Sequence, residues 1–417
     1  MRIQWLTVAA AASLATLSWA QSIPSCAAAC LESALTQSTC DATDFACICK
    51  DTQLMSSVET CTLASCNVID ALSAKNTTGA LCGDEIRDNT VVTPVVTAVS
   101  GFFAVVAVGM RLFEWHSQSE IHWADLCAVS ALVCTVVMGI LEFFMSADGF
   151  GKDIWTIEPY KIERIVKFTW LTEIFYFAAL GLTKITVLLF YLRVFPHQGM
   201  KMTCLISIGV CAAFTAAFTL AIIFHCWPIE YGWTSWTGET QGQCFDLNAF
   251  VWAHASISIV LDVWIMLIPV TTLLKLQLGT RKKVNLLIMF GIGIFITIVS
   301  CIRLSSFSTF ANTANPTYDN VATAYWSVLE AYVSVICCCL PAVRSLLRRV
   351  LPSCFGSTDG SVPTATYALS KRSGANPNTG IKKSVTNVIT FQQRSNESDT
   401  FELVDGDNVQ HTDYKGW

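Results

Sequence analysis

Eight of the chain's 19 cysteines lie within the 57 residues from Cys26 to Cys82. An even number of cysteines at this density is typical of a small module closed by disulfides, because so short a segment buries only a marginal core. A zinc site is the alternative, but zinc sites usually present two CxxC-like pairs, which this segment lacks. Because disulfides persist in oxidising compartments, the sequence predicts that this module lies outside the cell.

The cysteine spacing and the run DATDFACIC at residues 41–49 resemble the CFEM domain, an eight-cysteine extracellular module of fungal proteins, over about residues 21–85. The resemblance implies that Asp44, three residues before Cys47, is an axial ligand of haem iron. An anionic oxygen ligand suits ferric iron better than ferrous iron, so ferric haem is the implied cofactor. A surface carboxylate without a ligand is the alternative. The resemblance also implies four disulfides: Cys26–Cys66, Cys30–Cys61, Cys40–Cys47 and Cys49–Cys82.

The rest of the chain has the composition of a membrane protein. Hydrophobic residues make up 53% of the chain and charged residues only 14%, against roughly 25% charged in soluble domains. The net charge of -5 gives no reason to expect nucleic acid as a partner. Seven apolar segments follow the module, each long enough to cross a hydrocarbon core of about 30 Å. They span residues 91–110, 123–146, 162–195, 202–226, 248–274, 284–310 and 321–347.

These features predict an all-α protein in four parts. Residues 1–20 have the positive start, short apolar core and small residues of a signal peptide, and the core is too short for an uncleaved membrane anchor. A disulfide-rich helical ectodomain (21–85) and a seven-helix membrane domain (91–351) follow. The polar residues 352–417 are expected to form a disordered cytosolic tail.

We expect the helices to lie in the plasma membrane. The distribution of basic residues supports an orientation with the N-terminus outside and the C-terminus in the cytosol. Loops on the predicted inner side carry most of the basic loop residues, as the positive-inside rule requires. These residues are Arg111, Arg193, Lys201, Lys275, Arg281, Lys282, Lys283, Arg344, Arg348 and Arg349.

Three further positions suggest modification or cross-linking. Cys226 and Cys244 lie in one predicted outer loop and are expected to form a disulfide. Asn76 begins a glycosylation sequon in the ectodomain. Cys354 follows the basic amphipathic segment 343–351 and is a candidate for palmitoylation, with an unmodified thiol as the alternative.

Ionisable residues inside the predicted helices form a candidate intramembrane site. Each costs roughly 2.5–3.5 kcal/mol at a helix centre, so we expect them to face the bundle interior. At about 1.5 Å per residue, Glu173, Arg303 and Glu330 fall in the outer half, with Arg303 neutralised by one of the two glutamates. Asp262 falls near the middle and Lys184 towards the cytosol. A purely structural ion pair is the alternative to a binding pocket. The set comprises Glu142, Glu173, Lys184, Asp262, Arg303 and Glu330.

The helical region is similar to the fungal rhodopsin-like integral membrane family over about residues 91–351. The resemblance lies in the runs GFGKDIW (149–155), CWP (226–228) and LP (340–341), and in the intramembrane charges. Lys152 and Asp153 stand before Ile154 where that family has a histidine, so the resemblance assigns no role to this loop. Residues 321–343 contain no lysine for a retinal Schiff base, which argues against light sensing.

A CFEM module followed by such a bundle is similar to the PTH-type G-protein-coupled receptors of filamentous fungi. The resemblance implies a surface receptor for an extracellular or host cue, sometimes linked to pathogenicity. Coupling to a heterotrimeric G protein rests on analogy alone. Haem capture for iron acquisition and a structural or adhesive wall protein are the alternatives. We expect no enzyme activity, because no nucleophile–base set stands out.

Overall fold

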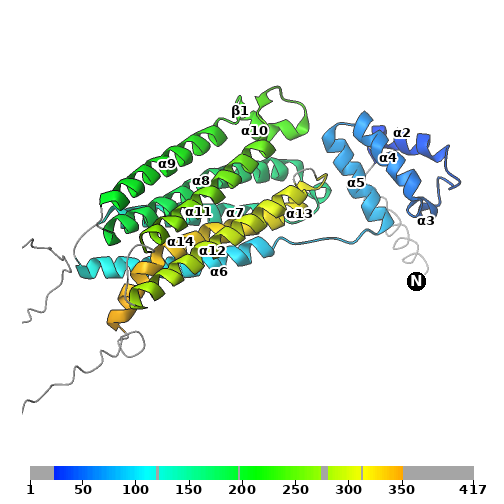
Figure 1. Cartoon of the computed structure of the whole chain (residues 1–417). Helices are drawn as coiled ribbons and strands as arrows, with labels where there is room; N and C mark the ends of the chain where they lie inside the picture. Colours follow the sequence, from blue (N-terminus) through cyan, green and yellow to red (C-terminus); the bar gives the residue numbers. More distant parts are fainter. Residues whose placement is uncertain (1–22, 119–121, 196–197, 274–279, 311–312, 351–417) are drawn as a thin grey trace, which may run out of the picture. The chain divides into compact units, whose positions relative to one another are not determined.

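A computed structural model describes residues 23–118, 122–195, 198–273, 280–310 and 313–350. The described chain is almost entirely helical, which confirms the predicted fold class (Figure 1). The predicted signal peptide, the predicted tail, Lys275 and Cys354 lie outside the described residues. The side chains of Arg281, Lys282, Lys283, Arg348 and Arg349 are also not described.

The N-terminal module contains four helices, and side-chain caps set the starts of the last three. Asp44 accepts a hydrogen bond from the Cys47 N–H, and Asn67 accepts one from the Asp70 N–H. Short polar side chains at these positions satisfy N–H groups that the first helical turn leaves free. Gly83, at φ 71°, ends the last helix in the left-handed conformation that favours glycine. The helices are α2 (Ser25–Leu35), α3 (Phe45–Ile48), α4 (Thr52–Ser65) and α5 (Val68–Cys82).

Four disulfides hold this module together, and they have the pairing that the CFEM resemblance implies. Two of them join α2 to α4, one closes the loop before α3, and one joins the end of α3 to the end of α5. Few apolar side chains of the module are buried, so the covalent bonds stabilise what the core alone does not. The bonds are Cys26–Cys66, Cys30–Cys61, Cys40–Cys47 and Cys49–Cys82.

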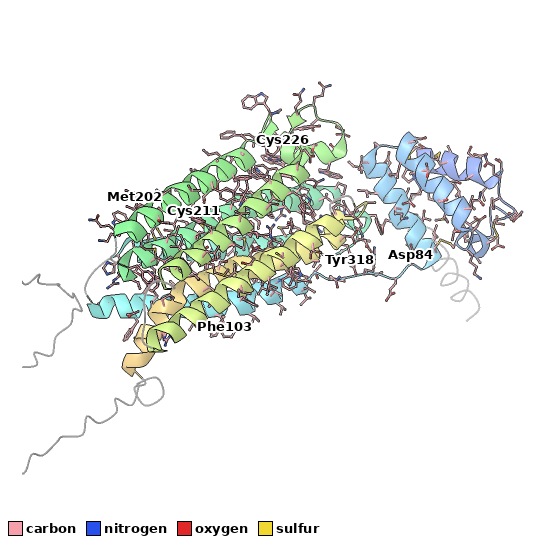
Figure 2. All side chains as sticks on the ribbon, viewed as in Figure 1. Asp84, Phe103, Met202, Cys211, Cys226 and Tyr318 are labelled. Atoms are coloured by element: carbon pink, nitrogen blue, oxygen red, sulfur yellow. A yellow bond between two sulfur atoms is a disulfide. The ribbon has the colours of Figure 1, made fainter. Side chains whose placement is uncertain are left out.

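Seven long helices form the second part. Within the described residues, six of them are long and apolar enough to cross a membrane, and the described apolar stretch of α12 is Gly293–Phe307. We call the end at which α6 begins the linker end, and the opposite end the tail end. Figure 2 shows Cys226 and Tyr318 near the linker end and Met202 near the tail end. The helices are α6 (Val92–Gln118), α7 (Trp123–Asp148), α8 (Pro159–Val194), α9 (Gln198–Ile223), α11 (Leu247–Leu273), α12 (Thr280–Phe310) and α14 (Val321–Val350).

Small residues bring α6, α7 and α14 close together in the bundle core. Lipid is as apolar as leucine, so close packing and polar contacts, rather than hydrophobicity, decide which helices meet. At Gly139, for example, a Cβ atom would lie 2.8 Å from Thr97 Cγ2 and 2.5 Å from the Tyr332 hydroxyl. The fully buried small residues of this core are Ala104, Ala128, Ala131 and Ala331.

The loops at the linker end carry short elements. Strand β1 (Cys226–Trp227) pairs antiparallel with β2 (Gln243–Cys244), and the expected Cys226–Cys244 disulfide joins them. Asn76 lies inside α5 and is half-buried, and its glycosylation stays a prediction. The other short elements are η2 (Ile154–Thr156), α10 (Tyr231–Thr234), η3 (Ser235–Thr237) and α13 (Pro316–Asp319).

Candidate functional site

The segment between the module and α6 is fastened to the bundle by Asp153. Arg87 of this segment forms an ion pair with Asp153 Oδ1 and donates a hydrogen bond from Nε to Oδ2 at 3.4 Å. Asn315, just before α13, donates from Nδ2 to the same Oδ1 at 2.7 Å. The Arg87 guanidinium also lies 4.3 Å from the Tyr318 ring centroid. We call these four residues the linker clamp.

The electrostatics of the linker clamp favour a permanent contact. Asp153 is only 5% exposed, although Arg87 remains half-exposed. The hydrogen bond with Asp153 raises the pKa of Arg87 above its ordinary value, so the guanidinium stays charged at any physiological pH. Burial takes water away from the Asp153 carboxylate, so it depends on the charged donor Arg87 and on Asn315 in place of hydration.

Backbone hydrogen bonds reinforce the same junction. The Asn89 N–H donates to the Gly151 carbonyl at 2.9 Å, and the Gly151 N–H donates to the Thr317 carbonyl at 3.0 Å. Gly151 has φ 110°, and a Cβ there would lie 2.6 Å from the Thr90 nitrogen. The run at 149–155, to which the resemblance assigned no role, therefore joins the linker to the loop before α14.

The intramembrane charges form two separate pairs. Arg303 Nε of α12 lies 2.8 Å from Glu330 Oε2 of α14, off the hydrogen-bond direction, so this contact is an ion pair. Tyr176 donates to Glu330 Oε2 at 2.7 Å, and Ser300 donates to Oε1 at 2.5 Å. All four side chains are at most 4% exposed. Glu173, the other predicted partner of Arg303, lies within its electrostatic reach.

Lys184 of α8 and Asp262 of α11 form the second pair, with Nζ 2.5 Å from Oδ1. The sequence placed Asp262 nearer the middle and Lys184 towards the cytosol, and it did not predict that the two meet. Helix α8 has 36 residues and α11 has 27, and the two residues lie ten and eleven positions from the tail-end terminus of their helices.

His254 was not predicted. It is 2% exposed and packs among aromatic rings near both pairs, with its ring centroid 4.0 Å from Phe177, 5.1 Å from Phe214 and 5.1 Å from Phe218. In the sequence His254 is a lone histidine within an apolar segment, and nothing else in that pattern marked it as a buried site residue.

Arg111 corrects one expectation about the predicted inner loops. It was counted with the loop cations, but it is 5% exposed in the structure. Its Nε donates to Asp125 Oδ1 at 2.7 Å and its Nη1 donates to the Cys338 carbonyl at 2.7 Å. Arg111 therefore ties α6, α7 and α14 together near the tail end and is not available to a partner.

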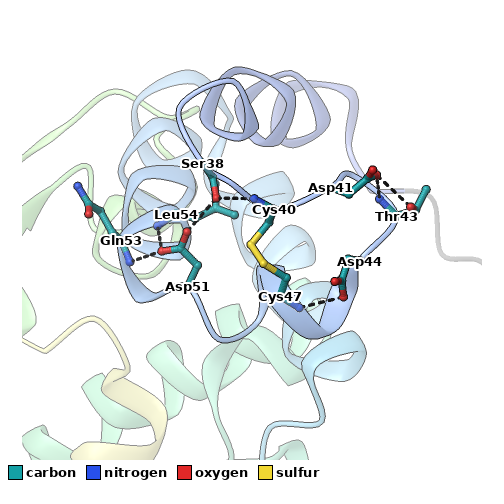
Figure 3. Close-up of a disulfide and its surroundings, with 9 residues drawn as sticks. All are labelled: Ser38, Cys40, Asp41, Thr43, Asp44, Cys47, Asp51, Gln53 and Leu54. Carbon is teal, nitrogen blue, oxygen red and sulfur yellow. Dashed lines mark hydrogen bonds between the residues drawn. A yellow bond between two sulfur atoms is a disulfide. The ribbon is translucent and has the colours of Figure 1, made fainter.

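Asp44 lies on the surface of the module. Its Oδ1 accepts the Cys47 N–H at 3.1 Å beside the Cys40–Cys47 disulfide (Figure 3). The loop that carries it is anchored by Asp51, which accepts from the Leu54 N–H at 3.0 Å and from the Ser38 hydroxyl at 2.9 Å. The Leu54 N–H contributes most to holding the pKa of Asp51 below its ordinary value, followed by Ser38.

Comparison with known proteins agrees with this architecture. Residues 110–349 match the fungal rhodopsin domain, and residues 19–83 match the CFEM domain. A SAT4 family membrane protein of Emericella nidulans is 31% identical over 205 residues, which is 48% of this chain but only 51% of that protein. Receptor GIN3 of Arthrobotrys oligospora is 26% identical over 67% of this chain and 71% of its own length.

The polyenoic acids biosynthesis gene cluster protein Ba17b of Metarhizium anisopliae is 26% identical over 61% of this chain and 73% of its own length. No solved structure matches the chain. The fungal rhodopsin match alone covers more than half of the 417 residues. The chain is a multi-pass membrane protein that belongs to the fungal rhodopsin domain family and carries a CFEM domain in its N-terminal part.

Proposed function

We propose that this protein is a cell-surface receptor that senses an extracellular or host cue through its CFEM domain and signals through its helical bundle. The linker clamp carries the proposal. A module that the helices merely anchor needs only a flexible tether, whereas here the linker is bonded to a buried acid and to a loop of the bundle. The similarity to Receptor GIN3 supports the same function.

The clamp leads directly to the buried charges. Asn315 and Thr317 lie six and four residues before α14, and Glu330 lies nine residues into that helix, about 14 Å along its axis. Because helices and packed cores move as rigid elements, a shift of the linker is expected to change the contacts of Glu330 with α8 and α12.

In this proposal the linker end faces the outside of the cell and the tail end faces the cytosol, across the plasma membrane. Lys275, before α12, and the basic residues 281–283 at the start of α12 would then contact a signalling partner, with a heterotrimeric G protein as the first candidate. No enzymatic step is part of the proposal.

Ferric haem is the cue that we propose to test first. The residues fit it, because Asp44 is exposed and only its Oδ1 is used in capping α3, which leaves Oδ2 for a metal. Phe45 beside it is 49% exposed and offers an apolar contact. When bound, haem would supply an iron centre whose affinity for the carboxylate falls on reduction. The exposure of Asp44 equally favours the alternative function, haem capture for iron acquisition.

One experiment separates these functions. Cells that express the full chain are exposed to ferric haem, and we measure cytosolic cyclic AMP and growth on haem as the sole iron source. The variants are Asp44→Ala and Arg87→Ala. The matched control is Lys161→Ala, which removes a surface ion pair with Glu158 (2.8 Å) at the same end of the bundle.

For a receptor we expect a change in cyclic AMP that both variants abolish and the control retains, at equal surface expression. Arg87→Ala should still bind haem, because the clamp lies outside the module. A cyclic AMP response that survives Arg87→Ala would contradict the clamp route. Growth on haem without any change in cyclic AMP would support iron acquisition instead.

A further inference from the structure

We propose a binding site for a small monovalent cation, of the size of Na⁺, between α6 and α7 near the linker end. Three side chains form it: Glu142, Thr93 and Thr97, which are 3%, 2% and 3% exposed. Glu142 Oε2 and both threonine hydroxyl oxygens are buried without a hydrogen-bond partner among the described residues. This site is independent of the proposed receptor function.

Two contacts fix the register of the two helices and bring these residues together. Near the linker end, the Ser146 hydroxyl donates to the Thr90 carbonyl at 2.6 Å. Two turns further in, a Cβ at Gly139 would lie 2.8 Å from Thr97 Cγ2. The two segments run antiparallel, so the seven residues from Ser146 back to Gly139 correspond to the seven residues from Thr90 forward to Thr97. Glu142 and Thr93 then differ in height by one residue, about 1.5 Å.

The two hydroxyls differ from those of other buried threonines in the bundle. The other buried threonines of the long helices donate back to a carbonyl of the same helix, at 2.8 Å for both Thr183 and Thr186. Thr93 and Thr97 do not make this bond, so their oxygens are free to act as ligands. A buried hydroxyl without a partner is destabilising, and a bound cation would remove that cost.

Charge balance favours a monovalent cation. Three other acids of the bundle contact a basic side chain: Glu330–Arg303, Asp262–Lys184 and Asp125–Arg111. No ion pair joins Glu142 to a described basic residue. A buried carboxylate needs a counter-charge. Carboxylate and hydroxyl oxygens suit hard cations. With a single carboxylate, a divalent ion would leave a net charge in apolar surroundings, whereas a monovalent ion leaves none.

The close approach of the helices limits the size of the ion. Gly139 lies one turn from Glu142 on the buried side of α7 and permits contact with both Thr97 and Tyr332. The Tyr332 hydroxyl donates to the Thr135 carbonyl at 2.8 Å, which fixes the ring beside the site. The ring therefore limits the volume open to an ion, while the hydroxyl oxygen keeps lone pairs that can face it.

The test uses the purified full chain in detergent. Its thermal unfolding midpoint is measured in NaCl, in KCl and in N-methyl-D-glucamine chloride at the same concentration and pH. The variants are Glu142→Gln and Thr97→Val. The matched control is Thr186→Val, because Thr186 is fully buried but uses its hydroxyl within its own helix.

At ten times the dissociation constant, Na⁺ stabilises the folded state about elevenfold, which raises the midpoint by about 2–4 °C over the glucamine salt. Potassium should give less. We expect Glu142→Gln to abolish the difference between the salts, Thr97→Val to need several-fold more Na⁺, and Thr186→Val to respond as the wild type does.

Because each variant also changes stability by itself, the readout is the difference between salts for one protein. Equal midpoints in all three salts for the wild type would overturn the proposal. So would a sodium effect that Glu142→Gln retains. A midpoint that depends on pH but not on Na⁺ would assign the neutralising charge to a proton, and would also overturn it.

Discussion

The ion pair between Arg303 and Glu330 makes a quantitative prediction. Glu330→Ala leaves the Arg303 guanidinium buried without its counter-charge, which costs about 3–5 kcal/mol. It also removes the acceptor of the Tyr176 hydroxyl. A buried donor without a partner costs about 1–3 kcal/mol, and part of this cost is already included in the figure for the unpaired charge. Ser300 keeps a partner, because its hydroxyl lies 3.1 Å from the Ile296 carbonyl and can donate its proton there once the carboxylate is removed. We expect a total loss of about 4–6 kcal/mol.

The paired variant should behave differently. Arg303→Met with Glu330→Met removes both charges and keeps most of the packed volume, and such replacements are often neutral or stabilising. We expect it to lie within about 2 kcal/mol of the wild type, the residual loss coming from the Tyr176 hydroxyl. The double variant should then be folded but unable to signal if the pair transmits the cue.

The assay is chemical unfolding of the detergent-purified chain, combined with cyclic AMP measured in cells. The exposed pair Lys161–Glu158 serves as the control cycle and should show little coupling. A double variant as unstable as Glu330→Ala would refute the argument that the unpaired charge causes the loss. A double variant that signals normally would leave the pair a structural role only.

Three further predictions concern the loops and the module. Gly151→Ala should lower stability by about 2 kcal/mol in thermal unfolding, because its positive φ and a backbone nitrogen 2.6 Å from the new Cβ oppose it. The hydrogen bond from the Leu54 N–H lowers the pKa of Asp51 in the folded module. The stability that Asp51 contributes is therefore complete above about pH 4, and it is lost as the pH falls through this lowered pKa. Asp51→Asn should flatten this acid loss in circular dichroism. Replacing Cys226 and Cys244 by serine should cost about 3 kcal/mol, from the 18-residue separation they close.

The sequence predicted those features that depend on composition and spacing. Cysteine density indicated the disulfide module, and the length of the apolar segments indicated the long helices. Both signals follow from physical limits, the small core of a 57-residue module and the thickness of a bilayer. The Cys226–Cys244 bond could be expected on the same grounds, since both cysteines lie in one loop on the predicted oxidising side.

The contacts that position the candidate site were beyond the sequence because they depend on the relative height of helices. Lys184 and Asp262 meet although their depths were predicted to differ. Arg111 is buried although positive charge near a helix end suggested a loop residue. Asp153 received no role, yet a linker with a single arginine and a nearby loop acid is a signal that could have suggested the clamp.

Polar side chains, rather than apolar ones, specify how this bundle is assembled. Apolar residues favour every helix equally, because lipid satisfies them as well as a neighbouring helix does. Charged residues have no such substitute, so each fixes a neighbour: Arg303 joins α12 to α14, Lys184 joins α8 to α11, and Arg111 joins α6 to both α7 and α14. Glu142 is 3% exposed and forms no ion pair with a described basic residue, so it departs from this pattern. A carboxylate that joins no two helices by itself is the place where a bound ion would complete the same set of contacts.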